Sequence, residues 1–161
     1  MPQRHQATKS PHQPRIGQGI ILAHLNRLQH KNIVKLLFTY ERLYGQRICM
    51  SSIFEYVPLN LYQYLKQLSR KIDIVEVKMI GWQLFRGQFH LQKMEICHRD
   101  IKPQNLLINP DSGILKISDF GSSILNPRKH AQSSYQVTRF YRPPELLLKS
   151  KAVKSVHTFI Y

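Results

Sequence analysis

Hydrophobic and polar positions follow two different periods along this chain of 161 residues, and each period predicts a type of secondary structure. Apolar runs of strand length, bounded by turn-forming residues, occupy residues 33–40, 47–54, 106–109 and 114–118. Apolar residues at helical spacing occupy residues 20–28, 61–68 and 74–94. We therefore expect one helix at residues 20–28, then two strands, two further helices and two more strands in chain order.

Two polar residues predict where the later helices begin. Asn60 can cap a helix that starts at Leu61, and Asp73 can cap a long helix that runs to about Met94. The long helix carries an apolar stripe near the helical period, made of Ile74, Val77, Ile80, Leu84 and Leu91. We expect this stripe to lie in the core.

Charge and composition limit the classes of partner. The formal net charge is +15, so nucleic acids and anionic membranes must be considered as partners. The basic residues are scattered, with no run of five or more Lys or Arg, and the aromatic residues lie in apolar stretches. This pattern favours nonspecific attraction over specific nucleic-acid recognition. The longest apolar runs are short and interrupted by charges, so no membrane partner is expected.

The chain has two cysteines, Cys49 and Cys97. Both lie in apolar sequence, which predicts reduced thiols in the core of a cytoplasmic or nuclear protein. The sequence also contains no signal-peptide pattern, in agreement with that location.

The chemistry of the chain is concentrated in the stretch from His98 to Asn105, which reads HRDIKPQN. A carboxylate, a lysine two residues later and an amide three residues further are groups that phosphoryl transfer needs on one loop. Asp100 would orient an acceptor hydroxyl and take its proton, and Lys102 would lie beside the phosphoryl group. The stretch therefore indicates phosphoryl transfer from ATP.

The predicted strands at residues 106–109 and 114–118 are joined by turn-forming residues, Pro110 to Gly113, and so form a predicted hairpin. A second motif, Asp119-Phe120-Gly121, supplies another carboxylate directly after this hairpin. Asn105 and Asp119 flank that hairpin, so its two strands bring their positions toward each other. An amide oxygen and a carboxylate are hard ligands that suit Mg²⁺ and leave coordination positions for phosphate and water. We predict that Asn105 and Asp119 are the magnesium ligands.

These motifs resemble the catalytic loop and magnesium-binding loop of the eukaryotic protein kinases, and Lys102 is similar to the serine/threonine branch. The segment YQVTRFYRPPE at residues 135–145 is similar to the end of the activation segment in cyclin-dependent, MAP and glycogen synthase kinases, with Pro143 replacing the usual alanine. The resemblance to glycogen synthase kinase-3 is the most extensive, because the segments NIV, EYVP, QLFR, ICH and DFGS fall in register with it.

The resemblance implies an α+β, truncated protein-kinase-like fold with part of the small lobe, the hinge and the first half of the mainly helical large lobe. It covers residues 16–148 as a partial kinase domain. Residues 149–161 leave the family pattern as a divergent C-terminal tail. Residues 1–15, rich in proline, histidine and glutamine, are predicted to be a disordered basic tail. A truncated large lobe is expected to leave apolar helix faces uncovered.

The resemblance also implies a nucleotide site. In the family, backbone groups of the hinge hold adenine, and the hinge here falls on Glu55, Tyr56 and Val57. The same register places Gln104 and Leu107 beside the nucleotide. ATP and Mg²⁺ are thus the implied cosubstrate and cofactor.

Two features that clamp ATP in the family are weak in this chain. The glutamate of the αC helix, which pairs with a strand lysine, falls on Ile21, and isoleucine cannot make that ion pair. Lys9, twelve residues earlier, is the only candidate for the lysine, and a solvated lysine in a tail is the favoured interpretation. Gly17-Gln18-Gly19 is only a fragment of the glycine-rich phosphate loop, and we do not assign it that role.

The activation segment supplies the regulatory candidates. Tyr135 holds the position of the family's regulatory tyrosine, and a phosphate there could pair with Arg139 or Arg142. An unmodified tyrosine remains an equal alternative. Arg99 matches a residue that holds a phosphate already present on substrates of glycogen synthase kinases. Thr138 matches the threonine that hydrogen-bonds the catalytic Asp and Lys in relatives.

Two functions of different classes follow. The first is a protein serine/threonine kinase of the glycogen synthase kinase type, which transfers the ATP γ-phosphoryl group to protein substrates. The second is a catalytically impaired kinase fragment that acts as a nucleotide- or partner-binding module. Nonspecific binding of polyanions through the net charge is a weaker third hypothesis.

Overall fold

The computed structural model describes residues 21, 29–45, 47–125 and 139–141. In chain order, with η for 3-10 helices, the elements are β1 (Leu36–Tyr44), β2 (Arg47–Phe54), β3 (Leu59–Asn60), α2 (Leu61–Gln67), α3 (Ile74–Lys93), β4 (Ile96–Cys97), η1 (Pro103–Asn105), β5 (Leu106–Asn109), β6 (Ile114–Ile117), η2 (Phe120–Ser122), β7 (Ile124–Leu125) and η4 (Arg139–Tyr141). This mixture of strands and helices confirms the expected α+β class.

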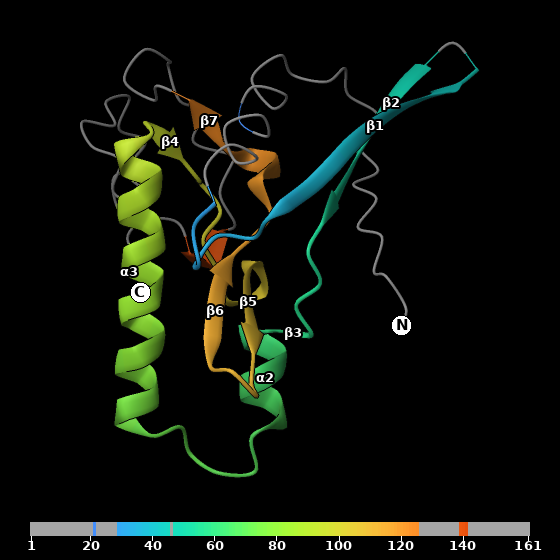
Figure 1. Ribbon diagram of the computed structural model, residues 1–161. Coiled ribbons are helices and arrows are strands. Elements are labelled where there is room, and N and C mark those ends of the chain that lie inside the picture. The colour runs from blue at the N-terminus through green and yellow to red at the C-terminus, as the bar shows by residue number, and fades with distance from the viewer. Residues whose placement is uncertain (1–20, 22–28, 46, 126–138, 142–161) are drawn as a thin grey trace.

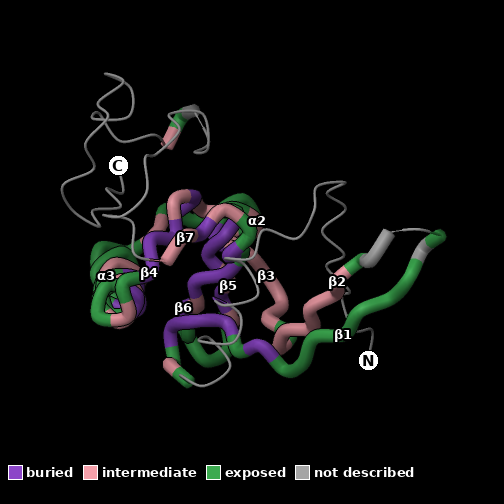
Figure 2. The backbone as a smooth tube through the Cα atoms, turned by 90° about the horizontal axis from the view of Figure 1, so that it is seen from above, coloured by how far each residue is buried: buried purple, intermediate pink, exposed green. Residues whose placement is uncertain are grey.

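The described strands form three small antiparallel sheets, β1-β2, β3-β5-β6 and β4-β7. Helix α3 stands at one edge of the described fold and contacts β6 and β4 on a single side (Figures 1 and 2). The short sheet β4-β7 joins the chain just before the His98–Asn105 loop to the chain just after Asp119. Two loops far apart in sequence are therefore held side by side.

Strands β1 and β2 form a long hairpin that projects away from the rest of the described fold (Figure 1). Two strands were predicted here, but the first begins at Leu36 rather than at Ile33. Ile33 instead makes an isolated parallel bridge to Ile117, and the N–H of Val34 donates to the Ile117 carbonyl at 2.9 Å. These contacts anchor the start of the hairpin to β6.

The predicted helix starts are confirmed, because each cap acts within its own helical turn. The Asn60 side chain accepts from the Gln63 N–H at 2.8 Å, and the Gln63 side chain accepts from the Asn60 N–H at 3.1 Å. This reciprocal capping box satisfies two backbone donors at the start of α2. The Asp73 side chain accepts from the Val75 N–H at 3.0 Å and caps α3 in the same manner.

The prediction for the apolar stripe of α3 is wrong at its N-terminal end. Ile74 and Val77 are 63% and 43% exposed, whereas Leu84 and Leu91 are buried and Ile80 is half-buried. The buried residues of α3 all lie from Gln83 onward, where β6 and β4 pack against the helix. Periodicity predicted one continuous stripe, but only the part that meets a strand is covered.

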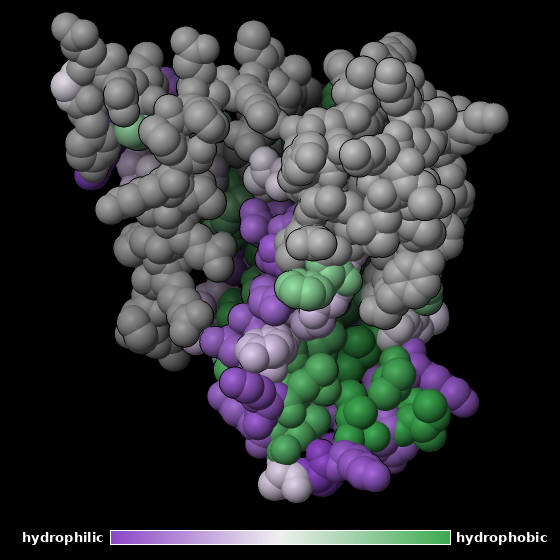
Figure 3. Space-filling view, turned by 180° about the vertical axis from the view of Figure 1, so that it is seen from behind, coloured by the Kyte–Doolittle hydropathy of each residue, from purple (hydrophilic) through white to green (hydrophobic). Residues whose placement is uncertain are grey.

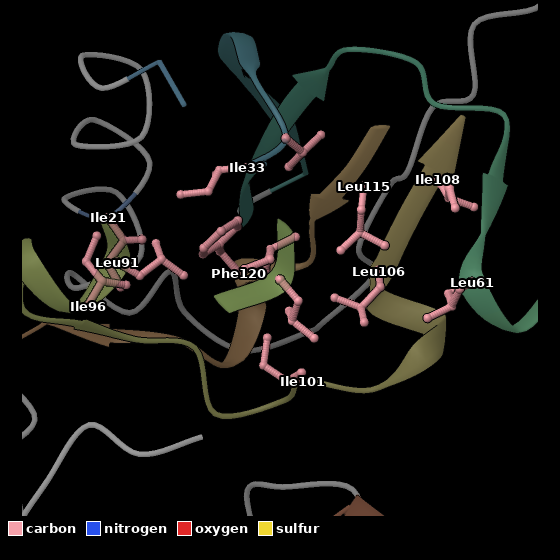
Figure 4. Close-up of a cluster of buried hydrophobic side chains, with 13 residues drawn as sticks. Ile21, Ile33, Leu61, Leu91, Ile96, Ile101, Leu106, Ile108, Leu115 and Phe120 are labelled. Atoms are coloured by element: carbon pink, nitrogen blue, oxygen red, sulfur yellow. The ribbon is translucent and has the colours of Figure 1, made fainter. Parts of the chain in front are cut away.

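The core lies between α3, the β5-β6 hairpin and the loop that carries Ile101 (Figure 4). Leu115 and Ile117 of β6 are fully buried at its centre. The cluster of buried apolar residues comprises Ile21, Ile33, Val34, Leu61, Leu84, Leu91, Ile96, Ile101, Leu106, Ile108, Leu115, Ile117 and Phe120. This core supports both ends of the hairpin that was predicted to carry the magnesium ligands.

Apolar side chains also reach the surface of the described residues. Seen from behind, hydrophobic patches lie between hydrophilic ones (Figure 3). Several large apolar residues of α3, among them Trp82, Phe85 and Phe89, are more than half exposed. No described helix has the length and apolar character needed to cross a membrane.

The two cysteines differ in environment, so the prediction that both lie in the core is wrong for Cys49. Cys49 is exposed, because the projecting β1-β2 hairpin has no covering layer among the described residues. Cys97 is buried as predicted, and burial raises the pKa of its thiol. The predicted tails at residues 1–15 and 149–161 lie outside the described residues.

Candidate active site

The loop between β4 and β5 brings Asp100, Lys102 and Asn105 into direct contact. Lys102 Nζ lies 2.7 Å from Asp100 Oδ2. The Asn105 side-chain nitrogen donates to the same oxygen at 3.0 Å and to the Asp100 carbonyl at 2.8 Å. A carboxylate held by an ammonium group and an amide has a fixed orientation, because charge-assisted hydrogen bonds are short and directional.

Local chemistry explains why the loop bends back on itself. Pro103 occupies the first position of η1, where its fixed φ favours a helical turn and its missing N–H removes no hydrogen bond. The Asn105 N–H closes the turn on the Lys102 carbonyl at 2.9 Å. The turn brings the Asn105 side chain within hydrogen-bond distance of the Asp100 carbonyl, although Asn105 comes five residues after Asp100.

The β5-β6 pairing continues beyond the named strands and brings the predicted magnesium ligands close together. The Asn105 carbonyl accepts from the Ser118 N–H at 2.9 Å and from Ser118 Oγ at 2.8 Å. Asp119 is the next residue in the chain and lies exposed at the end of the hairpin. Its φ of 61° is left-handed, which is rare for a residue other than glycine and typical of functional loops.

The donor set at this position fits magnesium. The Asn105 amide nitrogen is bound to Asp100, so its oxygen is the atom left for a metal. Asp119 Oδ1 accepts from the Gly121 N–H at 3.2 Å, which orients the carboxylate. Among the described residues, no three His, Cys, Asp or Glu side chains form a metal cage. Two oxygen ligands suit Mg²⁺, which is commonly completed by water and substrate phosphates.

His98 joins the loop that carries Asp100 to the chain just before Asp119. Its ring is fully buried, Nε2 lies 2.8 Å from the Ser118 carbonyl, and burial lowers the pKa of the imidazole. The ring also packs edge-on against Phe120, with centroids 5.0 Å apart. A neutral His98 that donates from Nε2 therefore holds the backbone immediately before Asp119.

Two further hydrogen bonds tie the same loops together. Ser123 Oγ donates to the His98 carbonyl at 3.2 Å, and Arg99 Nε donates to the Ser122 carbonyl at 2.5 Å. The sequence interpretation assigned no role to Ser118 or Ser123. The available signal was that each is a polar residue directly beside a predicted apolar strand or motif, and both are buried.

The hinge candidates follow β2, and Glu55 has a structural role of its own. Its N–H donates to the Lys35 carbonyl at 2.9 Å, and its Oε1 accepts from the Lys35 N–H at 2.7 Å. The same oxygen lies 2.8 Å from Lys116 Nζ on β6. The carbonyl is then the main-chain group of Glu55 left for a ligand.

The other hinge candidates are less engaged. Tyr56 is 60% exposed and Val57 is half-buried. Among the described residues, the Val57 N–H has no hydrogen-bond partner. Gln104 is exposed on η1, and Leu107 is half-buried on β5 beside Lys116.

Several predicted site residues cannot be placed. Lys9, Tyr135, Thr138 and Arg142 lie outside the described residues. Arg139 begins the short helix η4, which is described for its backbone.

Ile21 lies in a helical turn and is 1% exposed. Its side chain belongs to the core cluster and lies beside Leu91 and Ile96 (Figure 4). The position that the resemblance assigns to a charged glutamate is therefore occupied by a packing residue.

The sequence pattern of the protein kinase domain matches residues 9–159. The chain belongs to the protein kinase family. Three curated relatives are similar: "Glycogen synthase kinase 1" of Pyricularia oryzae (39% identical), "Putative serine/threonine-protein kinase gskl-1" of Caenorhabditis elegans (40%) and "Protein kinase gsk3" of Schizosaccharomyces pombe (36%). The matches cover 74%, 76% and 74% of this chain, and 32%, 34% and 32% of the relatives. The chain thus spans about a third of the length of these kinases.

Proposed function

We propose that this chain carries the catalytic loop and magnesium-binding loop of a protein serine/threonine kinase. The reaction is transfer of the γ-phosphoryl group of ATP to a hydroxyl of a protein substrate. The observation that carries the proposal is the contact of Asp100 with Lys102 and Asn105. The Asn105 carbonyl is in turn bonded to Ser118, the residue directly before Asp119. The names of the three relatives, all of them kinases, support the same class of reaction.

Each residue of the cluster has a distinct role in this proposal. Asp100 orients the acceptor hydroxyl and receives its proton as the oxygen attacks phosphorus. Lys102 balances negative charge on the transferred group, and its 2.7 Å contact with Asp100 keeps the two groups adjacent. Asn105 and Asp119 hold Mg²⁺, which when bound neutralises phosphate charge.

The hinge supplies the expected position for the adenine ring. A purine presents a donor and an acceptor on neighbouring edge atoms. The Glu55 carbonyl and the Val57 N–H offer the complementary pair, because the Glu55 N–H is already bonded to Lys35. The ion pair of Glu55 with Lys116 joins the hinge to β6. Asp119 follows two residues after the end of that strand.

A second candidate function is nucleotide binding without turnover. Ile21 favours it, because a buried isoleucine at the αC glutamate position cannot pair with the lysine that aligns ATP phosphates. Phosphoryl transfer depends on alignment of the phosphates to within about an ångström, so such a loss lowers turnover more than binding. Both functions use Asn105 and Asp119, and they differ only in the chemical step.

Transfer of label from γ-labelled ATP to a generic basic protein tests the catalytic proposal. If the chain is a kinase, Asp100→Asn lowers the rate by about 100-fold or more, because the proton acceptor is lost. Asp111→Asn is a matched control, since Asp111 is exposed in the turn between β5 and β6. Transfer at the same low rate in the natural chain and in Asp100→Asn contradicts a catalytic role.

A thermal-shift titration tests the binding step by itself. ATP with Mg²⁺ should raise the melting temperature, and ATP with a chelator should raise it much less. Asp119→Asn should remove the difference between the two conditions. A magnesium-dependent shift without label transfer identifies the binding module, whereas equal shifts with and without Mg²⁺ contradict the assignment of Asn105 and Asp119.

A further inference from the structure

Ser118 lies between the two proposed magnesium ligands, and its hydroxyl has no part in the functions proposed above. Its Oγ donates to the Asn105 carbonyl at 2.8 Å, and its N–H donates to the same oxygen at 2.9 Å. The Ser118 carbonyl lies 2.8 Å from His98 Nε2. Ser118 is 7% exposed, and Asp119 is the next residue of the chain. One buried residue therefore links Asn105, His98 and Asp119.

The backbone part of this link follows from the sheet. Strands β5 and β6 lie side by side with Leu106 paired to Ile117, and the contact of Asn105 with Ser118 extends their ladder by one residue (Figure 1). Any residue other than proline at position 118 supplies the same N–H. The hydroxyl is the part that depends on the side chain.

The hydroxyl gives the Asn105 carbonyl a second donor. A carbonyl oxygen has two lone pairs, and here the N–H and the O–H of Ser118 both donate to it. Because hydrogen bonds at a carbonyl are directional, two donors restrict the orientation of the Asn105 carbonyl as well as its distance from Ser118. The start of β5 is thereby held more firmly to the end of β6 than a single ladder bond would hold it.

Other hydrogen bonds of the two ligands act within their own loops. The Asn105 side chain donates to Asp100 on the loop between β4 and β5. Asp119 Oδ1 accepts from the Gly121 N–H, two residues later. These bonds orient each ligand, but they do not fix the separation of the two loops. Ser118 bonds directly to Asn105 and precedes Asp119, so it is placed to set that separation.

We propose that Ser118 is a positioning residue for magnesium, whose hydroxyl holds Asn105 and Asp119 at the separation that one metal ion needs. The inference rests on the proposed function, because it takes these two residues as the ligands. Mg²⁺ demands near-octahedral geometry at short distances, so two ligands that are free to move apart bind it less well. Ser118 touches neither the metal nor the nucleotide in this proposal. Loss of its hydroxyl should therefore weaken metal-dependent binding of ATP and leave binding without metal largely unchanged.

The quantity that tests the proposal is the magnesium enhancement, defined as the Kd of ATP with a chelator divided by the Kd of ATP with Mg²⁺. Isothermal titration calorimetry measures both constants at a temperature at which circular dichroism shows each variant to be folded. Ser118→Ala removes the hydroxyl and keeps the backbone N–H. We expect it to lower the enhancement by about three- to tenfold, the range that the loss of one hydrogen bond allows. The Kd of ATP with the chelator should stay within about twofold, because that complex does not use the metal ligands.

Two further variants separate positioning from folding stability. Ser118→Thr keeps the hydroxyl and should keep the enhancement within about twofold of the natural chain. Gln83→Met is the structural control, since Gln83 is also 7% exposed and accepts from the Leu115 N–H on the same strand at 2.9 Å. Its other hydrogen bonds join Asn32 and the Gly113 carbonyl, and none of them reaches a proposed ligand. Gln83→Met should therefore lower stability without changing the enhancement.

The comparison of Ser118→Ala with Gln83→Met decides the question even if the added methyl group of threonine prevents folding. A reduced enhancement in Ser118→Ala alone supports the proposal. An enhancement that is the same in the natural chain and in Ser118→Ala overturns the positioning role and leaves the proposed function intact. Equal reductions in Ser118→Ala and Gln83→Met also overturn it, because the hydroxyl would then only stabilise the hairpin. A natural chain without enhancement, or without ATP binding, contradicts Asn105 and Asp119 as ligands and overturns the proposed function together with this inference.

Discussion

Gln83 is a buried polar side chain that joins three parts of the fold. Its Oε1 accepts from Asn32 Nδ2 at 3.0 Å and from the Leu115 N–H at 2.9 Å, and its Nε2 donates to the Gly113 carbonyl at 2.8 Å. By contrast, the Gln88 side-chain nitrogen is buried and has no hydrogen-bond partner among the residues that the structure describes. The two residues lie five positions apart on α3 and test what a buried amide contributes.

We predict that Gln83→Met lowers the free energy of unfolding by about 1–3 kcal/mol, because it leaves buried donors and an acceptor unpaired. Gln88→Met should change it little or raise it, since the substitution removes an unsatisfied polar atom. Urea unfolding followed by far-UV circular dichroism measures both. A larger loss for Gln88→Met than for Gln83→Met contradicts this assignment of the network.

Helix α3 packs tightly against β6 at a glycine, Gly87. A Cβ added at Gly87 would lie 2.9 Å from Ile117 Cδ1 and 3.0 Å from the Asn32 carbonyl oxygen, whereas one added at Gly81 would meet nothing within 4 Å. Both glycines are inside the same helix, where alanine has the higher helical propensity by about 1 kcal/mol. Substitution by alanine should therefore raise stability at Gly81 and lower it at Gly87, where packing is close.

Gly81→Ala is predicted to stabilise the protein by up to about 1 kcal/mol. Gly87→Ala is predicted to destabilise it by about 1–3 kcal/mol, because the backbone oxygen of Asn32 cannot move aside without disturbing its bond from the Ile117 N–H. Thermal unfolding of the two variants side by side checks the difference. Equal stabilisation by both would mean that α3 does not pack on β6 at this distance.

Stability of the whole molecule should depend on pH through two histidines. Burial lowers the pKa of His98, and burial together with His90, Arg86 and Lys116 lowers the pKa of His30. The folded state therefore binds fewer protons than the unfolded state below the ordinary histidine pKa of 6.5. Stability is complete above that pH and is lost as the pH falls toward the folded values.

We expect the urea midpoint to decrease as the pH is lowered from 7 to 5. The hydrogen bonds of Glu76 with Tyr64 and Arg70 lower the pKa of that carboxyl. Protonation of Glu76 therefore changes stability only below about pH 4.5, outside this window. His30→Gln should reduce the slope, since glutamine keeps an acceptor for the Asn32 N–H but does not titrate. A midpoint that rises toward pH 5 would contradict the neutral state of both histidines.

The sequence by itself determined the features that local contacts control. Asn60 and Asp73 predicted helix starts correctly, because a capping side chain acts on N–H groups two or three residues away. The hairpin of β5 and β6 was predicted for the same reason, with Gly113 supplying the left-handed φ of 64° that its turn needs. The catalytic loop motif also placed Asp100, Lys102 and Asn105 within five residues, so their contact needed little tertiary information.

Only the tertiary structure decided which surfaces are covered and which polar atoms find partners. Periodicity placed Ile74 in the core although no described strand reaches it. The apolar sequence around Cys49 placed that residue in the core although its hairpin projects away from the rest of the described fold. The Glu55 bridge to Lys116 and the Ser123 bond to His98 join residues 61 and 25 positions apart. Burial and long-range hydrogen bonds depend on which residues pack against a given residue. The local sequence pattern does not specify those neighbours.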